Sequence, residues 1–350
     1  MKTATSIWSR IADVAGLVAT PLIPSHYISL VSPLSATHRR QARVDAIRME
    51  TADVCTLTLK TGRGWVPHRP GQHVRVQVAV DGRLTTRMYS ISSVPSHDRI
   101  AITVKAQGRV SRALHEVEPG EYLAVGLPEG DFVLPADAQR ALFITGGSGI
   151  TPIASMVRTL AACGALHDFV HVHYARTEHD EIFGHELREI AAANPGYQLT
   201  IIHSDRDPRL LSSERLDAMV PDWRTRETWA CGPAGMLAAL ETIYAGTAAL
   251  HIERFAAALA PLPANDSGGT VRFLSSRTEA RSDGRTPLLR IAEDAGVNAP
   301  HGCRMGICHS CDATLVKGCA RDLRTGDLAA PGARIQICVC APAGDIEIDL

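Results

Sequence analysis

Three of the nine cysteines in this chain lie within nine residues, at Cys303, Cys308 and Cys311, and two more, Cys338 and Cys340, follow near the C-terminus. The spacing C-x4-C-x2-C, followed by a distant cysteine, is typical of a thiolate cage around a [2Fe–2S] cluster. Zinc usually takes two C-x2-C pairs, and a redox dithiol at Cys308 and Cys311 would have no use for Cys303. We therefore expect an iron–sulfur site. A structural zinc knuckle on an NAD-binding regulator is the alternative from another class of protein.

The fourth thiolate has two candidates. Cys338 follows 334–337, an alternating run that is typical of a strand, and Cys340 lies two residues further on. On an extended strand, side chains two residues apart point to the same side, so both cysteines remain open at this point. Cys338 resembles the closing cysteine of plant-type ferredoxins. The expected metal ligands are therefore Cys303, Cys308, Cys311 and Cys338, with Cys340 as the alternative.

Composition places further bounds on the chain. Its 350 residues are enough for two or three domains. A formal net charge of −1 gives no general attraction to nucleic acid or to acidic membranes. Cysteines clustered for metal binding, rather than spread as a disulfide framework, indicate a reducing, cytoplasmic location.

The N-terminal segment, residues 1–40, combines an apolar stretch with few charges. Its apolar stretch is interrupted by Arg10 and Asp13 and is too short to span a bilayer. It lacks the uninterrupted apolar core of a signal peptide. We expect a helix that packs on its own protein or docks a membrane-bound partner, and no transmembrane segment. The apolar residues that keep helical spacing are Ile7, Ile11, Val14, Leu17 and Val18.

Residues 41–136 consist of short runs in which apolar and polar residues alternate, as in 42–47, 55–59 and 73–78. Turn sequences separate these runs, a pattern that predicts an antiparallel β-barrel. The string Arg87-Met88-Tyr89-Ser90 lies on one of the predicted barrel strands, and Gly108-Arg109-Val110-Ser111 follows later.

Both strings resemble the flavin-binding signatures of the ferredoxin–NADP reductase family. The resemblance implies that Arg87 pairs with a phosphate, that Tyr89 flanks the isoalloxazine ring, and that the Ser90 hydroxyl lies near its N5 atom. These side chains suit those roles, because a guanidinium can donate two parallel hydrogen bonds to a phosphate and an aromatic face stacks on a flat ring. Gly108 and Ser111 are similar to the family's G-x-x-S, which meets the pyrophosphate at a helix start. FAD is expected rather than FMN.

After residue 136 the pattern changes to that of an α/β domain, which we place at 137–257. An apolar strand, 141–145, runs into the glycine-rich turn 146–152 and then into a helix, 153–160. Strand, glycine turn and helix bring backbone N–H groups and a positive helix end to a pyrophosphate. The turn lacks the third glycine of G-x-G-x-x-G, and a purely structural turn is the alternative. It is similar to the Gly-Gly-x-Gly-Ile-Thr-Pro motif of the same reductase family, and its candidate residues are Gly146, Gly147, Gly149, Thr151 and Pro152.

Strands at 169–176, 197–203 and 227–230 alternate with helical stretches, which predicts a parallel sheet with ligands at the carboxyl ends of its strands. The last of these strands runs into Cys231-Gly232-Pro233-Ala234-Gly235-Met236. This string is similar to the family's second nicotinamide motif. The resemblance implies that Cys231 stands beside the ring carbon that gives up hydride, with Gly232 and Met236 completing the site.

The choice between NADPH and NADH depends on the charged turn after the strand 197–203. In the resembling family a serine and arginines of this region bind the 2′-phosphate. Candidates for this role are Arg176, Ser204, Arg206 and Arg215, so NADPH is expected rather than NADH. Asp205 and Asp207 favour the opposite reading, because either one could pair with Arg206 or accept a ribose hydroxyl.

Residues 258–269 have the composition of a linker, rich in Pro, Gly, Asn, Asp and Ser. The remaining residues, 270–350, contain a strand pair at 270–273 and 278–281, a helix at 286–296 and the cysteine-rich loop. This order predicts a β-grasp ferredoxin domain of the α+β class.

The three motif sets together predict an NAD(P)H oxidoreductase that passes electrons from the nicotinamide through the flavin to the cluster. Ser90 and Cys231 are the expected catalytic residues, and they act by placing the two rings. Residues 21–27 and 32–34 are similar to proteins that feed membrane-bound fatty-acyl desaturases. The expected partner is therefore a desaturase, with the protein held at the inner face of the membrane through that partner. The alternative is the reductase component of a ring-hydroxylating or other oxygenase, which has the same three domains.

Overall fold

The computed structural model of the protein describes Leu34 and residues 40–80, 83–209, 211–246, 249–255, 268–302, 304–306 and 309–350. Most of the predicted N-terminal segment and of the predicted linker, together with Cys303 and Cys308, lies outside these ranges. The chain forms two compact units. The first comprises Met1–Leu84 and Met88–Ile252, and the second comprises Thr85–Arg87 and Glu253–Leu350.

An antiparallel sheet forms the first half of the first unit, as the alternating runs predict. Its strand order is β4-β3-β6-β1-β2-β5, and an isolated bridge from Ile91, just after β4, to Ile102 in β5 links the two edges into a barrel. Inward-facing residues such as Leu57, Val76 and Val104 fill its interior. The elements are β1 (Gln41–Thr51), β2 (Val54–Thr61), β3 (His73–Val80), β4 (Arg83–Ser90), β5 (Arg99–Lys105), the short helix α3 (Arg109–His115) and β6 (Tyr122–Val125).

The second half of this unit is an α/β domain with the sheet order β11-β10-β7-β8-β9. The register of β10, β7, β8 and β9 is parallel, which confirms the predicted fold class. The strands are β7 (Arg140–Gly146), β8 (Asp168–Ala175), β9 (Tyr197–His203), β10 (Thr228–Cys231) and β11 (Leu250–Glu253).

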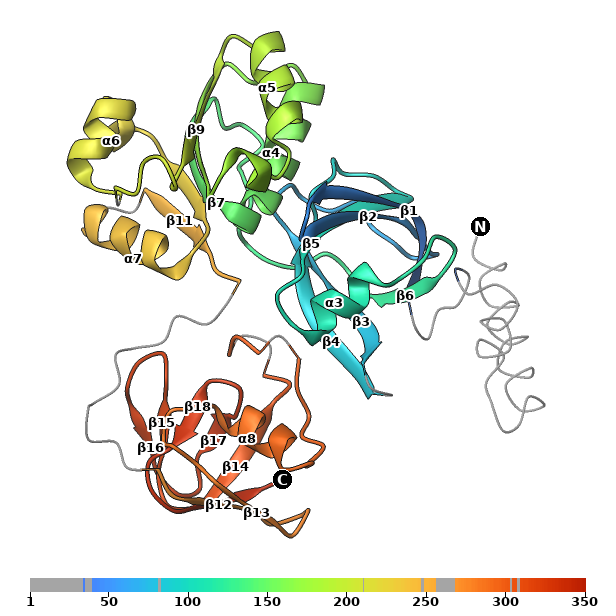
Figure 1. Ribbon diagram of the computed structural model, residues 1–350, viewed down its shortest axis with the longest axis vertical. Helices are drawn as coiled ribbons and strands as arrows, with labels where there is room; N and C mark the ends of the chain where they lie inside the picture. Colours follow the sequence, from blue (N-terminus) through green and yellow to red (C-terminus); the bar gives the residue numbers. More distant parts are fainter. Residues whose placement is uncertain are drawn as a thin grey trace, which may run out of the picture. The chain divides into compact units, whose positions relative to one another are not determined.

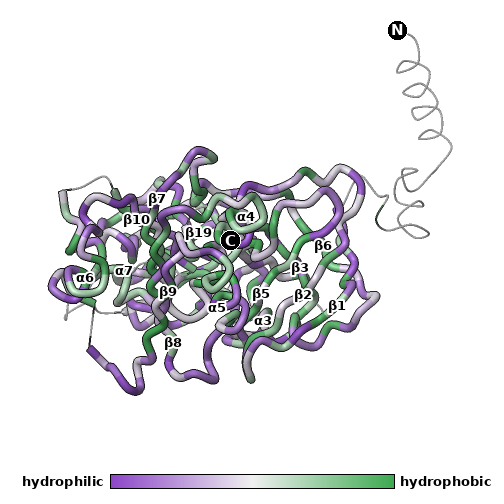
Figure 2. The backbone as a smooth tube through the Cα atoms, turned by 90° about the horizontal axis from the view of Figure 1, so that it is seen from above, coloured by the Kyte–Doolittle hydropathy of each residue, from purple (hydrophilic) through white to green (hydrophobic). Residues whose placement is uncertain are grey.

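Helices cover both faces of this parallel sheet (Figure 1). Phe143 on β7 packs toward α4 and α5, whereas its neighbour Leu142 packs toward α6 and α7, because successive side chains of a strand point to opposite faces. With both faces covered, the central strands β7, β8 and β10 are buried almost throughout, and Figure 2 shows apolar, green stretches in this sheet. The helices are α4 (Ile150–Ala162), α5 (Gly184–Ala193), α6 (Ser213–Met219) and α7 (Ala234–Ile243).

The second unit has the predicted β-grasp arrangement. Helix α8 (Leu288–Asp294) packs its apolar face on a five-stranded sheet of order β13-β12-β19-β14-β17. A small second sheet has the order β16-β15-β18. The strands are β12 (Thr270–Phe273), β13 (Thr278–Arg281), β14 (Asp312–Lys317), β15 (Ala320–Asp322), β16 (Leu328–Ala329), β17 (Arg334–Gln336), β18 (Cys340–Pro342) and β19 (Ile346–Asp349).

The prediction that Cys338 and Cys340 share one face of an extended strand is wrong. Residues 337–339 form a turn between β17 and β18, which belong to different sheets. The turn is stable because its backbone groups find partners: Val339 N donates to Gln336 O (3.0 Å), and Val339 O accepts from Leu323 N (2.7 Å). The two cysteines are therefore in different environments.

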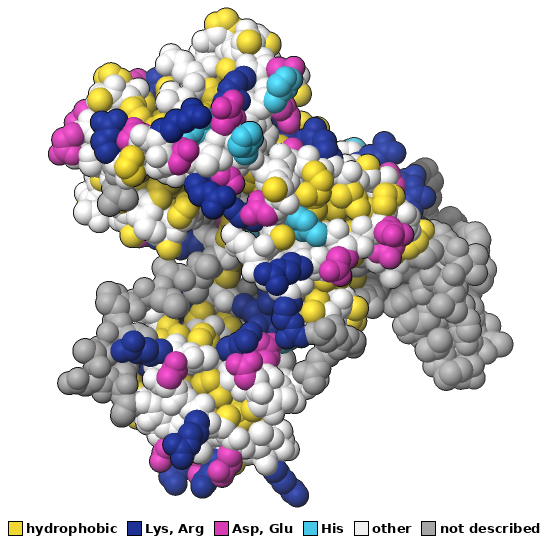
Figure 3. All heavy atoms as spheres, in the orientation of Figure 1, with side chains coloured by type: hydrophobic (Ala, Val, Ile, Leu, Met, Phe, Trp, Pro, Cys, Tyr) yellow, Lys and Arg dark blue, Asp and Glu magenta, His cyan; other side chains and the backbone are white. Residues whose placement is uncertain are grey.

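On the face of the first unit shown in Figure 3, basic and acidic side chains are interspersed, in keeping with a formal net charge of −1. Among the helices of the described ranges, none combines the length and the apolar character needed to cross a bilayer.

Candidate functional site

Strand β4 carries the first group of predicted residues. Arg87 and Tyr89 are two residues apart and share one side of this edge strand, whereas Ser90 follows on the other side. Ser90 is buried, and Tyr89 packs against the core of the barrel. Arg87 donates from Nη1 to Thr86 O (2.8 Å). The barrel thus fixes the order and spacing of the three side chains that are expected to meet the flavin.

Gly108 and Ser111 form the turn that begins α3. The Ser111 hydroxyl accepts from the amides of Gln107 (3.0 Å) and Gly108 (2.9 Å) and donates to Gly108 O (3.0 Å). One O–H and two lone pairs are then all in use, so Ser111 shapes the helix start and has no hydroxyl capacity left for a ligand. A Cβ at Gly108 would meet nothing within 4 Å. The turn is therefore open enough for a pyrophosphate to reach the first-turn amides of the helix.

The glycine turn follows β7 directly and leads into α4. A Cβ on Gly149 would lie 2.1 Å from Cys231 O and 2.6 Å from Gly232 N, so only glycine allows the two backbones to approach this closely. A Cβ on Gly147 would meet nothing within 4 Å, which leaves room for a bound phosphate beside the turn. Thr151 in the first turn of α4 donates its hydroxyl to Ser148 O (3.0 Å).

The two predicted nicotinamide motifs are thereby brought together at the carboxyl edge of the parallel sheet. Cys231 on β10 pairs with Thr145 on β7, and Cys231 is almost completely buried. A Cβ on Gly146 would lie 2.7 Å from Pro233 Cδ and 3.4 Å from Met236 Sδ. This edge is where open parallel sheets bind their ligands, and two motifs that begin 85 positions apart in the chain, at Gly146 and Cys231, meet there.

A buried polar network supports this edge and was not predicted. Thr145 Oγ1 lies 2.8 Å from both His171 Nε2 and His173 Nδ1, and His171 Nδ1 lies 2.7 Å from the Tyr197 hydroxyl. Burial lowers the pKa of His173 to about 4 and the pKa of His171 well below its usual value, so both imidazoles are neutral. The alternation in 169–174, with histidine at every second residue of an apolar strand, is the signal that could have indicated it.

The candidate 2′-phosphate residues divide into two groups. The side chain of Arg215 is only 10% exposed, and it donates to Asp207 Oδ2 (2.6 Å) and Arg209 O (2.8 Å). Asp207 also accepts from Arg209 (2.7 Å), and hydrogen bonds from the two arginines hold the pKa of this carboxyl well below its usual range. Asp207 therefore pairs with Arg209 and Arg215 and not with Arg206. The guanidinium of Arg215 is therefore used in hydrogen bonds within the protein.

Arg176, Ser204 and Arg206 make up the second group and are exposed. The pairing of Ala175 with His203 places Arg176 and Ser204 side by side at the ends of β8 and β9. Arg176 pairs with Asp180 (3.1 Å) within its own loop. The side chain of Arg206 is 69% exposed and lies 3.9 Å from the carboxylate of Glu178. This loose pairing leaves Arg206 the best placed of the candidates to turn toward an anionic ligand.

Of the four predicted cluster ligands, the structure describes Cys311 and Cys338. Both are buried, and Ile337 N donates to Cys311 O (3.3 Å) beside the turn that holds Cys338. Hydrogen bonds from the thiol and amide of Cys338 lower the pKa of Cys311 to about 6 despite its burial. The two sulfurs are thus close together, and the site favours the thiolate form that iron needs. By contrast, burial and the nearby Asp322 raise the pKa of Cys340 to about 12.

Arg324 fixes the described part of the cysteine-rich loop. It donates to Gly306 O (2.7 Å) and Gln336 Oε1 (3.0 Å) while paired with Asp322 (2.6 Å). Gly306 has a φ of 71°, and a Cβ there would lie 2.4 Å from Arg324 Nη1. Glycine is therefore required at position 306, because a side chain there would collide with the guanidinium of Arg324. The sequence motif alone did not indicate Arg324.

Sequence profiles of three families match the chain in succession. They are described as oxidoreductase FAD-binding domain over residues 42–134, oxidoreductase NAD-binding domain over 143–242, and 2Fe-2S iron-sulfur cluster binding domain over 273–343. The chain therefore contains domains for FAD, for a pyridine nucleotide and for a [2Fe–2S] cluster, in that order.

Among characterised proteins, the chain is similar to an NADPH oxidoreductase of Mycobacterium tuberculosis, with 42% identity over 98% of this chain and 93% of the relative. It is 32% identical to a glycine betaine monooxygenase reductase subunit of Chromohalobacter salexigens, over 80% of this chain and 86% of the relative. It is 30% identical to the ferredoxin reductase component of a 3-ketosteroid-9-alpha-monooxygenase of Mycolicibacterium smegmatis, over 84% and 91%.

A solved structure, that of phthalate dioxygenase reductase, has the same fold, with a TM-score of 0.62 and 24% identity over 89% of this chain and 97% of that one. Barrel, parallel sheet and C-terminal [2Fe–2S] domain follow the same order in this chain. The chain belongs to the ferredoxin–NADP reductase-like family of NAD(P)H oxidoreductases that carry FAD and a C-terminal [2Fe–2S] domain.

Proposed function

We propose that this protein is the NADPH-dependent reductase component of an oxygenase system, delivering electrons to a separate oxygen-activating protein. The observation that carries the proposal is the order of FAD, nucleotide and [2Fe–2S] domains in one chain that aligns over 80% or more of its length with named oxygenase reductase components. The chain supplies the electron path, and the partner would supply the oxygen chemistry.

FAD accepts two electrons together as hydride and passes them on one at a time, which suits a nicotinamide donor and a one-electron cluster. The residues of this chain act by placement. The turn at Gly147 and Gly149 and the adjoining Cys231 would hold the nucleotide. Arg87, Tyr89 and Ser90 would hold the flavin, with the α3 turn that Gly108 and Ser111 form facing its pyrophosphate. Cys311 and Cys338, together with Cys303 and Cys308, would hold the cluster.

NADPH is the proposed donor. Arg206 and Ser204 are exposed at the end of β9, beside Arg176 at the end of β8, where a guanidinium and a hydroxyl could receive a 2′-phosphate. Of the two acidic residues in this turn, Asp207 is already paired with two other arginines, whereas Asp205 lies exposed between Ser204 and Arg206. The name of the M. tuberculosis relative also supports this choice.

The proposed acceptor is an oxygenase, which replaces the desaturase expected from the sequence. The expectation of a desaturase depended on residues 21–27 and 32–34, of which the structure describes only Leu34. The relatives named as monooxygenase reductase components support the oxygenase alternative better. Association with a membrane through a desaturase is therefore not part of this proposal.

The test uses the purified full-length protein with its native flavin and cluster. NADPH and NADH are compared as donors under anaerobic conditions while the flavin and cluster absorbances are followed. The holoprotein is then used to capture its partner from its own cells. We expect preferential reduction by NADPH and capture of an oxygenase whose turnover the protein supports. Capture of a desaturase that it drives, with no oxygenase, would refute the proposed acceptor.

A further inference from the structure

Helix α4 links the two cofactor domains of the first unit. It begins at Ile150, directly after Gly149 of the glycine turn, and Thr151, Ser155 and Arg158 follow one another on a single helix face, four and three residues apart. Ser155 and Arg158 thus lie only about 6–12 Å along the helix from its start. Because a helix of this length is rigid, the groups that this face contacts keep a fixed distance from the proposed nucleotide site.

That face contacts the segment that follows β4, the strand of the flavin motif. Arg158 donates from Nη1 to the carbonyl oxygen of Ser92, and Ser155 donates its hydroxyl to the carbonyl oxygen of Ser93 (2.6 Å). Ser92 and Ser93 come directly after Ser90 and Ile91, at the end of β4. Helix α4 therefore hydrogen-bonds to the backbone two and three residues beyond Ser90, the serine predicted to bind the flavin.

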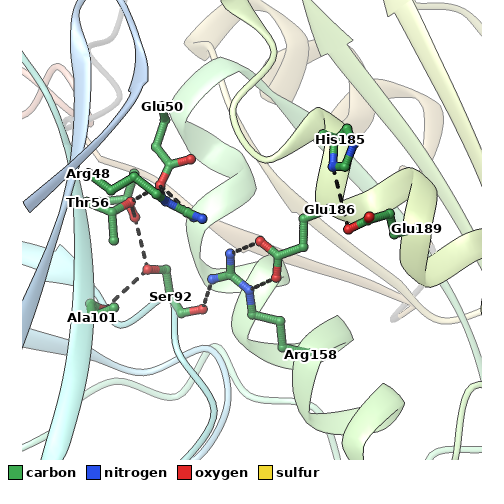
Figure 4. Close-up of polar contacts among 10 residues, drawn as sticks. Arg48, Glu50, Thr56, Ser92, Ala101, Arg158, His185, Glu186 and Glu189 are labelled. Carbon is green, nitrogen blue, oxygen red and sulfur yellow. Dashed lines mark hydrogen bonds and ion pairs between the residues drawn. The ribbon is translucent and has the colours of Figure 1, made fainter.

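Each partner in this contact is itself held in place. Figure 4 shows Arg158 between Ser92 and Glu186, a residue of α5. Arg158 makes two hydrogen bonds of 2.6 Å to the carboxylate of Glu186 and stacks 4.2 Å from the centroid of the Phe183 ring. The side chain of Arg158 is 16% exposed and that of Glu186 34%, so water screens this pair only in part. The nucleotide domain therefore orients the guanidinium before it reaches the barrel.

The barrel fixes the other side of the contact. The Ser92 amide donates to Ala101 O (2.8 Å), and the Ser92 hydroxyl lies 2.9 Å from Thr103 Oγ1 (Figure 4 shows Ser92 beside Ala101). His68, which is almost completely buried, places Nε2 3.1 Å from Ser93 O and 3.3 Å from Ser155 Oγ. The segment that carries the two carbonyls is thus held by β5, through Ala101 and Thr103, and by His68.

We propose that Arg158 and Ser155 are positioning residues for hydride transfer: through the carbonyls of Ser92 and Ser93 they set the separation between the nucleotide bound at the start of α4 and the flavin bound on β4. This rests on the proposed nucleotide and flavin sites. In the step concerned, a hydrogen with its electron pair leaves the nicotinamide, which is oxidised, and joins the flavin, which is reduced. The rate of such a step falls steeply when the donor and acceptor are misplaced by about 1 Å.

The variants Arg158→Ala, Arg158→Lys and Ser155→Ala test this in the full-length holoenzyme. The matched control is Arg188→Ala, which breaks a similar bidentate pair between Arg188 of α5 and Glu181 (2.6 and 2.7 Å) without touching the barrel. Flavin content is measured first. Flavin reduction by NADPH is then followed anaerobically in stopped flow, with unlabelled and with 4-deuterated NADPH. Hydrogen exchange of the amides at residues 91–94 gives a readout that does not depend on turnover.

We expect Arg158→Ala to lower the limiting rate of flavin reduction roughly 10- to 100-fold. Its flavin content should stay near wild type, its half-saturating NADPH concentration should change less than about threefold, and its deuterium isotope effect should rise because hydride transfer becomes slower. Exchange at residues 91–94 should accelerate. Arg158→Lys should recover part of the rate, Ser155→Ala should lose roughly 3- to 10-fold, and Arg188→Ala should behave as wild type.

The proposal is overturned if Arg158→Ala keeps the wild-type limiting rate, or if its defect lies entirely in flavin content or in half-saturation. If Arg158→Ala does not fold, Ser155→Ala decides: a wild-type limiting rate and isotope effect in that variant would overturn the proposal. A wild-type enzyme that NADPH does not reduce would refute the proposed function itself, and the two failures are thereby distinguished.

Discussion

The arginines of the nucleotide domain have two different roles. Some form ion pairs that stabilise the fold, and others are available to bind a ligand. Arg215 and Arg158 are half-buried and make short hydrogen bonds to carboxylates, with Asp207 and Glu186 as partners. The hydrogen bonds of Arg158 also keep the pKa of Glu186 low although burial alone would raise it. Arg206 is exposed and only loosely paired. Exposure and pairing, rather than residue type, therefore separate the two roles.

Arg206→Ala should raise the Michaelis constant for NADPH about 10- to 100-fold and leave that for NADH nearly unchanged. The reason is the loss of one charge-assisted contact to the 2′-phosphate, worth about 1.5–3 kcal/mol. Steady-state kinetics with both nucleotides measure this. Arg224→Ala, which removes another exposed arginine paired with Asp217, is the control. An equal loss with both nucleotides would remove Arg206 from the 2′-phosphate site.

Cys338→Ser should abolish the iron–sulfur absorbance and leave flavin reduction by NADPH intact, whereas Cys340→Ser should retain the cluster. Cys338 lies in a turn within hydrogen-bonding reach of Cys311, while Cys340 is buried at the start of β18, in the smaller sheet. Iron and sulfide analysis of the two purified variants measures this. Iron lost from Cys340→Ser and kept in Cys338→Ser would reverse the ligand assignment.

At the scale of elements, the nucleotide site depends on two turns whose backbones touch. Gly149→Ala should abolish NADPH-dependent flavin reduction and destabilise the protein by about 1–3 kcal/mol, because the new methyl group collides with the Cys231 carbonyl. Gly235→Ala, in the first turn of α7 where a Cβ meets nothing within 4 Å, should be neutral or slightly stabilising. Urea melts and stopped-flow reduction measure both variants. A Gly149→Ala enzyme with wild-type kinetics would contradict this packing.

The buried histidines of β8 should make the stability of the nucleotide domain depend on pH. Unfolded His173 binds a proton below about pH 6.5, but folded His173 does so only below about pH 4, chiefly because of burial. Between these values the unfolded chain holds more protons, so stability is full above about pH 6.5 and is lost as the pH falls toward 4. The contribution of His173 is on the order of 3 kcal/mol.

His173→Asn should therefore flatten the loss of stability between pH 6.5 and 4, even if it lowers stability at neutral pH. Urea melts at half-unit pH steps measure the slope. His185→Asn, at a side chain that is 89% exposed, should leave the slope unchanged. His171 lies beside His173 and contributes with the same sign, so the slope should fall without vanishing. An unchanged slope in His173→Asn would show that this imidazole is not buried neutral.

At the scale of the whole molecule, one chain contains all the cofactor domains, and the sequence of residues 1–40 contains none of the cofactor motifs. Leu34 O accepts from Arg63 N (2.7 Å) at the barrel, so a deletion meant to spare the fold should stop before it. Deletion of residues 1–32 should leave NADPH-dependent ferricyanide reduction unchanged and weaken transfer to the natural acceptor. Comparing the two rates measures this. Loss of flavin from the truncated protein would instead make this segment part of the fold.

The sequence by itself determined the domain order, the fold class and most of the strands. Alternation with a period of two marks barrel strands, continuous apolar runs mark buried parallel strands, and glycine turns mark where chain and ligand approach closely. Such signals are local. The motif around Cys231 and the turn at Gly149 were both recognisable without the tertiary structure for this reason.

Only the tertiary structure decided which distant residues meet. Asp207 pairs with Arg215 rather than with its neighbour Arg206, and a turn rather than one strand separates Cys338 from Cys340. Arg158 reaches the carbonyl of Ser92 across 66 residues of chain. Ion pairs and hydrogen bonds depend on distances of a few ångströms between side chains, and packing of whole elements sets those distances. Residue type and spacing alone therefore do not specify them.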